Sequence, residues 1–526
     1  MTEQSNISQL SAQDAQFLYI QSATNLTHVM AVYIYDPSTA PGGKVRFKDI
    51  IEHMRKRLDV SPMFKRKLYR LPLDIDHPYW VEDEHFDLEA HISHSRLPEP
   101  GDWRQFCIHV ARHHSKPLDM TRPLWDMYVL EGFDNIPGYA KGSYAILTRI
   151  HHSTIDGVSG AHFFAAISDN DTKGTPAIPL PEGKPAANNL PTIAEILSRA
   201  VNSTVTSPVK LAQALLKFTP ALLSTAQKSL KGGDENTNTG VPETRFNGPV
   251  TPNKMFDAVT FDLDELKKMR LKVSDATIND VVLAICSGAL RHYLTKHKEL
   301  PKESLVAVAP VNARNRSGDE SNPGNNISAM TIKIWSNIAD PIERLEAIKD
   351  TTRETKAAKS GLSARIMTDL TKHIPGVTMA GVARILTDER FAPKMSNLMV
   401  SNVPGPQIQL YMNGAKLTHQ YGLAPLAHGM GLFIATPSYN GTISFSIISD
   451  RKMMPDVEFF RECLQRAFNE LKDAKPSAVA RRTKKPAASS KQPAKPKDGS
   501  VMYRRVATKP RAIASKAIGG SKPKVK

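Results

Sequence analysis

The segment that most constrains this chain covers residues 144–160 and has the sequence YAILTRIHHSTIDGVSG. Its apolar first half is typical of a buried strand, which is expected to end at the neighbouring His151 and His152. Asp156 and Gly157 then occupy a turn, where an aspartate can bond to nearby backbone or pair with an arginine and a glycine suits a tight conformation. A helix is expected to follow, so the segment predicts a strand–turn–helix unit with two histidines at its bend.

These two histidines are the candidates for chemistry. Successive side chains of a strand point to opposite faces, so one histidine can face the interior while the other faces a cleft. A neutral imidazole, with a reference pKa of about 6.5, can accept a proton from a hydroxyl group, which suits acyl transfer from an activated ester to an alcohol. A purely structural histidine pair is the alternative. No metal site is expected, because neighbouring histidines diverge and no third ligand has a suitable spacing. A serine triad is not expected either, because no G-x-S-x-G elbow is evident.

Strands and helices alternate on both sides of a long connection, which predicts α/β or α+β structure in two lobes of similar size. The expected strands are 29–35, 125–130 and 144–150 in the first lobe and 258–263, 305–311, 397–401, 431–436 and 442–448 in the second. Helices are expected at 47–58, 103–115, 158–168, 278–294, 341–357 and 362–372, with a further one beginning at 264. In the last strand, large apolar residues alternate with serines, so one buried and one polar face are expected.

Changes in composition divide the chain into a first lobe over 1–170, a linker over 171–252, a second lobe over 253–473 and a tail over 474–526. The linker is rich in Pro, Gly and Asn at both ends, which is typical of exposed connections. Between these ends, residues 192–230 have the apolar spacing of amphipathic helices. Such helices either pack on their own protein or lie on a bilayer with their lysines near the lipid phosphates.

Most of the net charge belongs to the tail. The tail holds sixteen Lys and Arg against one acidic residue, Asp498, so it carries fifteen of the chain's net charge of +17. It is dominated by Lys, Pro, Ala and Ser and cannot bury enough apolar surface to fold, so we expect it to be disordered. An anionic membrane attracts such a segment by about 1 kcal/mol per basic residue. A solvated tail is the alternative, and nucleic-acid binding through counterion release is the least favoured.

Neither a membrane-spanning segment nor a secretory signal is expected, since no run of about 18 apolar residues and no basic, apolar leader is present. The three separated cysteines, Cys107, Cys286 and Cys463, form no disulfide framework and no cysteine metal site. A reducing cytoplasm is therefore the expected location.

Residues 151–157, HHSTIDG, match the HHxxxDG motif of the CoA-dependent acyltransferase superfamily, which includes chloramphenicol acetyltransferases and peptide-synthetase condensation domains. More specifically, the body from about residue 8 to 473 resembles bacterial wax ester synthases/acyl-CoA:diacylglycerol acyltransferases. This resemblance rests on further blocks in the family's order: LSAQDAQFL at 10–18, RPLW at 122–125, NGP at 247–249, TINDVVLA at 277–284 and SNVPGP at 401–406.

The resemblance implies an α/β (α+β) two-lobe CoA-dependent acyltransferase fold of the chloramphenicol acetyltransferase/condensation-domain type, followed by the disordered basic tail. A tunnel between the lobes would admit acyl-CoA from one side and a lipid alcohol from the other. The resemblance further implies that His152 is the general base for the acceptor hydroxyl and that His151 supports its geometry. Asp156 is then structural, and Gly157 shapes the turn.

The second lobe contributes one further candidate, Asn279, whose amide can reach a developing oxyanion; polarity at a helix start explains this residue equally well. Thr277 is predicted to be the N-cap of that helix, with Asp280 closing a capping box in which Asp replaces the usual Glu. Four residues of the motif blocks are assigned to architecture: Arg122, Trp125, Asp280 and Asn402.

The implied activity is transfer of a fatty acyl group from acyl-CoA to a fatty alcohol, to diacylglycerol or to both, which gives wax ester or triacylglycerol. Acyl-CoA is a substrate, so neither a metal nor a redox cofactor is expected. We expect the protein in the cytoplasm, peripheral on the inner membrane or on lipid inclusions, held by the tail and the linker helices together. An acyltransferase with another acceptor and a non-catalytic lipid-droplet protein are the competing hypotheses.

Overall fold

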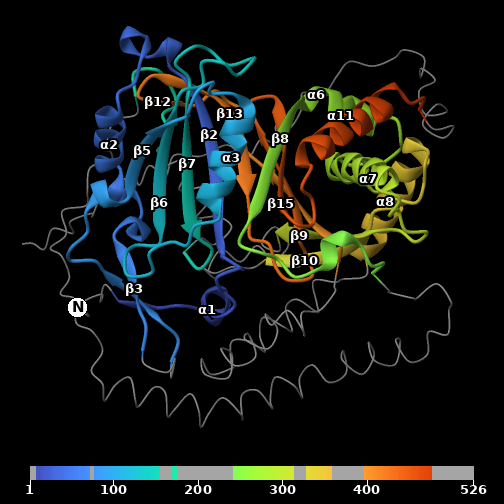
Figure 1. Ribbon diagram of the computed structural model, residues 1–526, viewed down its shortest axis with the longest axis horizontal. Coiled ribbons are helices and arrows are strands. Elements are labelled where there is room, and N and C mark those ends of the chain that lie inside the picture. Colours follow the sequence, from blue (N-terminus) through green and yellow to red (C-terminus); the bar gives the residue numbers. More distant parts are fainter. Residues whose placement is uncertain are drawn as a thin grey trace, which may run out of the picture. The chain divides into compact units, whose positions relative to one another are not determined.

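The computed structural model describes residues 7–71, 76–154, 167–174, 241–312, 327–357 and 396–476 (Figure 1). All of them belong to one compact unit, Met1–Thr483. Several predictions fall outside the described residues: Asp156 and Gly157, the linker helices, the helix at 362–372, nearly all of the helix at 158–168 and the tail from residue 477.

The first sheet has six strands and carries the histidine-bearing strand near its centre (Figure 1). Its order is β12-β13-β2-β7-β6-β5, formed by β2 (His28–Asp36), β5 (Ile92–Arg96), β6 (Trp125–Glu131), β7 (Tyr144–His151), β12 (Tyr411–Met412) and β13 (Ala415–Leu423). β7 pairs antiparallel with β2 and with β6, and all eight of its residues are buried. Burial on both faces explains why the first half of this strand is apolar without alternation.

Two strands of this sheet come from the second half of the chain. β13 pairs antiparallel with β2, from Lys416 opposite Asp36 to Leu423 opposite Met30, with an irregularity between Leu417 and His419. In Figure 1 the orange β13 lies alongside the blue β2. The sequence assigned all of 253–473 to the second lobe, and it did not reveal this exchange. The added strand covers the edge of β2, which would otherwise expose unpaired backbone groups.

Helices α2 (Phe47–Arg55) and α3 (Trp103–His114) pack on opposite faces of the first sheet. Alternate residues of β2 divide between them: Tyr33 and Tyr35 belong to the cluster that contains α2, and Val32 and Ile34 to the cluster that contains α3. This division follows from the two-residue period of a strand. The α3 cluster also includes residues of the second lobe, so the two lobes share one core.

A small antiparallel sheet and a short helix stand beside the first sheet. The sheet consists of β1 (Ser8–Gln9), β3 (Arg66–Tyr69) and β4 (Tyr79–Glu82), in the order β1-β4-β3. The helix, α1 (Ala12–Tyr19), begins at Ser11, whose side chain accepts a hydrogen bond from the Asp14 amide at 3.1 Å. Short 3₁₀ helices lie at Pro37–Thr39, Pro41–Gly43, Leu58–Val60, Pro62–Phe64, Leu88–Ala90 and Arg245–Asn247.

The second sheet also has six strands, and a layer of helices packs against it (Figure 1). Its order is β10-β9-β11-β14-β15-β8, formed by β8 (Lys254–Asp262), β9 (Val306–Asn312), β10 (Ile327–Lys333), β11 (Leu398–Pro404), β14 (Leu432–Tyr439) and β15 (Thr442–Asp450). The helices are α6 (Leu263–Arg270), α7 (Ile278–Lys296), α8 (Pro341–Ala357) and α11 (Val457–Asp473). The expected helices at 278–294 and 341–357 are confirmed, whereas β10 and α11 were not predicted.

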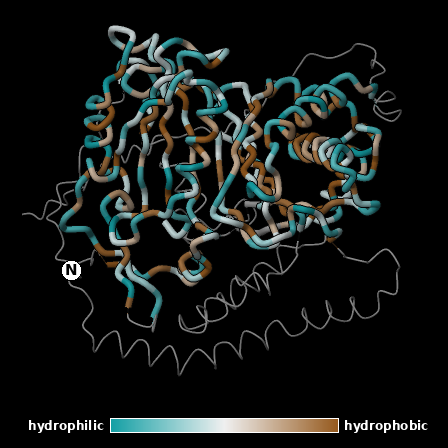
Figure 2. Tube along the Cα trace, viewed as in Figure 1, coloured by the Kyte–Doolittle hydropathy of each residue, from teal (hydrophilic) through white to brown (hydrophobic). Residues whose placement is uncertain are grey.

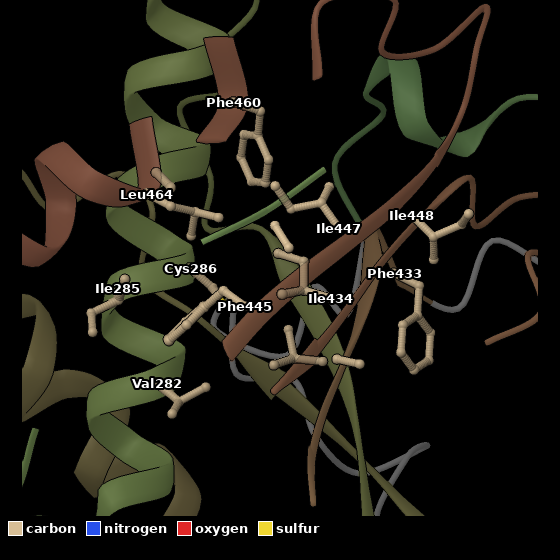
Figure 3. Close-up of a cluster of buried hydrophobic side chains, with 14 of the residues drawn as sticks. Val282, Ile285, Cys286, Phe433, Ile434, Phe445, Ile447, Ile448, Phe460 and Leu464 are labelled. Carbon is tan, nitrogen blue, oxygen red and sulfur yellow. The ribbon is translucent and has the colours of Figure 1, made fainter. Parts of the chain in front are cut away.

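The helix α7 is the centre of the second lobe. Every residue from Asp280 to Leu290 is buried, which agrees with its mostly hydrophobic colour in Figure 2. Figure 3 shows side chains of α7, among them Ile285 and Cys286, in one cluster with Phe445 of β15 and Leu464 of α11. A helix that is apolar on nearly all sides requires neighbours all around it, and α6, α8, α11 and the sheet supply them.

The expectation of one polar face on β15 is wrong. Ser444, Ser446 and Ser449 are as buried as the apolar residues between them. The face of the strand that carries Ser444 and Ser446 lies towards β13, and the Gly422 amide of β13 donates to Ser446 Oγ at 3.1 Å. Ser444 Oγ lies 3.0 Å from Thr260 Oγ1 of β8. Ser444 and Ser446 are therefore small polar residues at the boundary between the lobes, where hydrogen bonds satisfy their hydroxyl groups.

No described helix is both long and apolar enough to cross a membrane.

Candidate active site

The strand β7 delivers the histidine pair to the edge of the first lobe. His151 is its last residue and lies opposite His28, the first residue of β2. The His151 amide donates to the Leu124 carbonyl and the His152 amide to the Thr27 carbonyl, each at 2.9 Å. The backbone of both histidines is therefore held by neighbouring segments at the point where the strand ends.

His151 is completely buried, and its neighbours define its protonation. The backbone amide of Ser153 donates to its Nδ1 at 3.2 Å, so Nδ1 carries no proton. Its Nε2 donates towards Gln21 Oε1 and Thr27 Oγ1, both at 2.9 Å. Burial, together with nearby His28 and His152, lowers the pKa of His151 to about 3. This ring is a neutral structural group with both nitrogens in use.

His152 has a different environment although it is the next residue. Its side chain is half-buried, and its ring stacks on Phe17 of α1 with a centroid separation of 3.9 Å and an interplanar angle of 15°. Burial lowers the pKa of His152 to about 4, and the residue's own backbone opposes the shift. His152 is therefore a neutral imidazole at pH 7, positioned by an aromatic platform and still partly accessible.

More histidines lie behind the pair. His28 Nε2 donates to the His114 carbonyl at 2.9 Å, and the two rings meet edge to face with centroids 4.9 Å apart. Burial lowers the pKa of His28 to about 3 and that of His114 well below its usual value. The interior beside the site is thus built from imidazoles that must stay neutral in the folded protein.

The second lobe reaches the site at Thr24. The Lys254 ammonium, at the start of β8, donates to the Thr24 carbonyl at 3.4 Å, and His428 Nε2 lies 3.4 Å from Thr24 Oγ1. Thr24 is part of the loop of residues 20–27, which also supplies the Gln21 and Thr27 contacts of His151. The loop beside the histidine pair is therefore contacted from both lobes.

The residues assigned to architecture occupy scattered packing positions. Trp125 is fully buried; its Nε1 donates to the Phe64 carbonyl at 3.1 Å, and its ring stacks on His91. Arg122 is about half exposed and pairs with Asp119 at 3.3 Å. Asn402 is half-buried on β11, opposite Thr436 of β14. None of the described contacts of these residues reaches the histidine pair.

Asn279 and Asp280 begin α7. The predicted capping box is present: the Thr277 amide donates to Asp280 Oδ2 at 2.8 Å, and Thr277 Oγ1 accepts from the Asp280 amide at 3.3 Å. Asp280 is buried and also accepts from Thr352 Oγ1 of α8 at 2.7 Å, so it ties two helices together. Asn279 is half-buried in the first turn, and no described contact joins it to His152.

Several residues around the pair were missed at the sequence level. Phe17 falls within the block at 10–18, but an aromatic at that spacing indicates only a helix core. No sequence pattern marked Gln21, Thr27 or Lys254 as part of the site, because each of them acts through contacts between segments far apart in the chain. His428 lies outside the motif blocks.

Two further observations bear on other kinds of site. Within the described ranges, no three His, Cys, Asp or Glu residues are grouped so that they could hold a metal ion. A cavity of about 630 Å³ lies among α7, α8 and α11, where its walls include Arg291, Arg344 and Glu470. None of its lining residues was a predicted site residue.

Solved structures with this architecture define the class of protein. The wax ester synthase/diacylglycerol acyltransferase from Marinobacter aquaeolei VT8 matches with a TM-score of 0.63 and 25% identity, over 88% of this chain and 98% of that one. A trichothecene 15-O-acetyltransferase from Fusarium sporotrichioides shares the fold, with a TM-score of 0.54 and 12% identity over 88% of this chain and 95% of its own. The fold and the histidine motif are those of a two-lobed acyltransferase.

Sequence comparison gives the family. Residues 10–282 match the profile of the wax ester synthase/diacylglycerol acyltransferase catalytic domain, and residues 323–472 match the C-terminal domain of the same family. A putative diacylglycerol O-acyltransferase from Mycobacterium tuberculosis is 32% identical over 88% of this chain and 89% of its own length. The O-acyltransferase WSD from Acinetobacter baylyi is 30% identical over 85% and 93%. The chain belongs to the wax ester synthase/diacylglycerol acyltransferase family, and it is an acyl-CoA-dependent O-acyltransferase.

Proposed function

We propose that the protein transfers a fatty acyl group from acyl-CoA to the hydroxyl group of a fatty alcohol or of diacylglycerol, with His152 as the general base. The observation that carries this proposal is the contrast between the two adjacent histidines. His151 is sealed and uses both ring nitrogens, whereas His152 is neutral and half-buried on the Phe17 ring.

The proposed role requires the ring proton of His152 on one particular nitrogen. Nδ1 is completely buried, and we propose that it carries this proton. Nε2 is then the proton acceptor. It takes the hydroxyl proton as the acceptor oxygen attacks the thioester carbonyl, and it returns this proton to the sulfur when the tetrahedral intermediate collapses. The products are the ester and CoA-SH, so this route uses no further cofactor.

A shift of the pKa to about 4 has a consequence for the mechanism. His152 is almost fully in its basic form at pH 7, but it is a weaker base than a solvated imidazole. Correct placement of both substrates must therefore contribute a large part of the rate.

Replacing His152 tests the proposal directly. His152→Ala should lower the rate of CoA release, followed with a thiol-reactive dye, by about 10²- to 10⁴-fold, the usual range for a positioned general base. The matched control is His292→Ala, because His292 is another half-buried histidine and bonds only to Glu470 of the second lobe among its described contacts. This control should remain near the wild-type rate. An unchanged rate in His152→Ala would remove His152 from the mechanism.

The acceptor is the next quantity to measure. The relatives are named for both wax ester synthase and diacylglycerol acyltransferase activity, so we propose both products for this chain. Hexadecanol and diacylglycerol offered in competition with one acyl-CoA should yield wax ester and triacylglycerol, separated by chromatography. Rapid CoA release with a short-chain alcohol or an amine, and none with either lipid, would contradict the proposed acceptors.

We further propose that the enzyme works in the cytoplasm at the surface of the inner membrane or of lipid inclusions. The support is the sequence of the tail, which concentrates fifteen of the net positive charges, together with the apolar character of both proposed products. A chain truncated after residue 474 should bind anionic liposomes more weakly than the full chain and turn over detergent-dispersed substrate at nearly the same rate. Equal liposome binding by both chains would refute the electrostatic anchor.

A further inference from the structure

The loop of residues 20–27 is the part of the first lobe that holds the histidine pair. It is internally rigid: the Ser22 amide donates to the Asn25 carbonyl at 3.0 Å, and the buried Asn25 side chain donates to the Ile20 carbonyl at 3.1 Å. At its two ends, Gln21 and Thr27 make the polar contacts of His151 Nε2. A displacement of the tip of this loop is therefore passed on to the histidines.

The tip, Thr24, is held only from the other lobe and by Ser22, among its described contacts. Lys254 donates to the Thr24 carbonyl at 3.4 Å and to the Thr251 carbonyl at 2.5 Å, and its ammonium lies 4.0 Å from Asp450. The Lys254 side chain is only 6% exposed, so these groups replace its hydration. It thus bridges the β8 end of the second lobe and the loop of the first.

His428 makes the second contact with the tip. The Val250 backbone amide donates to its Nδ1 at 3.1 Å, so Nε2 carries the proton and points its N–H towards Thr24 Oγ1. The segment that bears His428 is itself fixed, because the Gly429 carbonyl accepts from the buried Asn247 side chain at 2.9 Å. Thr24 therefore meets two donors that belong to a rigid part of the second lobe.

We propose that Lys254 and His428 are positioning residues of the acyl transfer: by holding Thr24 across the lobe boundary, they fix the loop that orients His151 and His152. We call Thr24, Lys254 and His428 the Thr24 clasp. This inference rests on the proposed function of His152. The clasp makes the geometry of the base depend on the correct approach of the two lobes.

Placement of this kind affects turnover more than binding. A reacting group that is misplaced by about 1 Å can lose about 10²-fold in rate, so partial release of the loop should cost on the order of tenfold. Lys254→Met should lower kcat by about tenfold and leave the KM values for acyl-CoA and acceptor within about twofold. The matched control is Lys272→Met, since the Lys272 ammonium also donates to backbone carbonyls, at the end of α11 and far along the chain from the site. Lys272→Met should retain the wild-type kcat even if it melts at a lower temperature.

The pH profile separates positioning from general structural support. Burial lowers the pKa of Lys254 to about 8, against the opposing effect of Asp450. The other titratable groups that face it are His114, which is neutral at these pH values, and His428 across Thr24. As pH rises through 8, the ammonium becomes an amine and its hydrogen bonds weaken, so kcat should fall. Lys254→Arg stays charged, so this alkaline fall should disappear in that variant whatever its absolute rate.

A double-mutant cycle tests the His428 contact. Thr24→Val and His428→Leu should each lower kcat by several-fold, and the double variant should be no slower than the slower single variant, because both remove the same contact. Strict additivity of the two effects would overturn the proposed role of the clasp. So would a wild-type kcat in Lys254→Met combined with an unchanged fall of kcat at alkaline pH in Lys254→Arg. His152→Ala keeps the two proposals apart: if it abolishes CoA release while Lys254→Met does not lower kcat, only the clasp fails.

Discussion

Lowering the pH from 7 to 5 should strongly destabilise the folded protein. Its interior contains histidines that stay neutral at pH 5 as long as they are buried and become charged at that pH when the chain unfolds. Burial lowers the pKa of four of them far below the ordinary value of 6.5: to about 3 for His28 and His151, and to about 4 for His152 and His419. The cause is the same in each case, since burial removes the water that would solvate an imidazolium.

The sign follows from proton binding. Below pH 6.5 the unfolded chain protonates these histidines, whereas the folded protein does not until the pH approaches 4, so the unfolded state binds more protons and stability is lost as the pH falls. At pH 5 the difference amounts to about 2 kcal/mol for each group, from about 1.36 kcal/mol per pH unit over about 1.5 units. Four such groups together are comparable with the whole stability of a typical folded protein, about 5–15 kcal/mol.

The measurement is urea unfolding at pH 7, 6 and 5, followed by tryptophan fluorescence. A matched variant isolates one group: the His419 ring packs against the Tyr139 ring, with centroids 4.8 Å apart, and no hydrogen bond of its side chain is found among the described residues. His419→Phe keeps a flat ring there and removes the titration. It should reduce the loss of stability between pH 7 and 5 by about 2 kcal/mol. A free energy of unfolding that stays constant from pH 7 to 5 in the wild type would refute the reasoning.

Three further predictions follow from the same structure. Because burial lowers the pKa of His152 to about 4, kcat/KM should show no inflection at 6.5 when initial rates are measured from pH 7.5 to 6; an inflection there would mean that the ring is solvated. Asp169→Ala leaves the Arg57 guanidinium buried without its carboxylate partner, and it should lower the free energy of unfolding by about 3–5 kcal/mol in urea titrations. In Gly288→Ala the new Cβ would lie 2.8 Å from Arg344 Nη2, so the free energy of unfolding should fall by about 1–3 kcal/mol and the melting temperature should fall with it. An unchanged melting temperature would contradict the tight packing of α7 on that guanidinium.

The local elements could be predicted well from the sequence. The expected helix at 341–357 has the bounds of α8, and the expected strand at 144–150 differs from β7 by one residue. The capping box at Thr277 and Asp280 is present as expected. These features depend on neighbours along the chain, because capping residues and hydrophobic periodicity act over a few positions.

The pairing of strands could not be predicted from capping residues or hydrophobic periodicity. The residues of β13 alternate between buried and half-buried positions in the folded protein. Nothing in their sequence indicates that β2, nearly 400 positions away, is the partner strand. The serines of β15 illustrate the same limit: alternation predicted a polar face, and the other lobe covers that face. Exposure is decided by what packs on a surface, which is a property of the assembled fold.

The sequence by itself determined that two histidines stand at the end of a buried strand, and the motif indicated the kind of chemistry they serve. Only the tertiary structure decided how they differ. His151 is sealed by Gln21 and Thr27 from a distant loop, while His152 rests on Phe17 and stays accessible, and the loop between these contacts is held by Lys254 of the other lobe. Two identical and adjacent imidazoles acquire different surroundings because solvation and hydrogen bonding are set by groups that chain folding, not sequence order, brings within 4 Å.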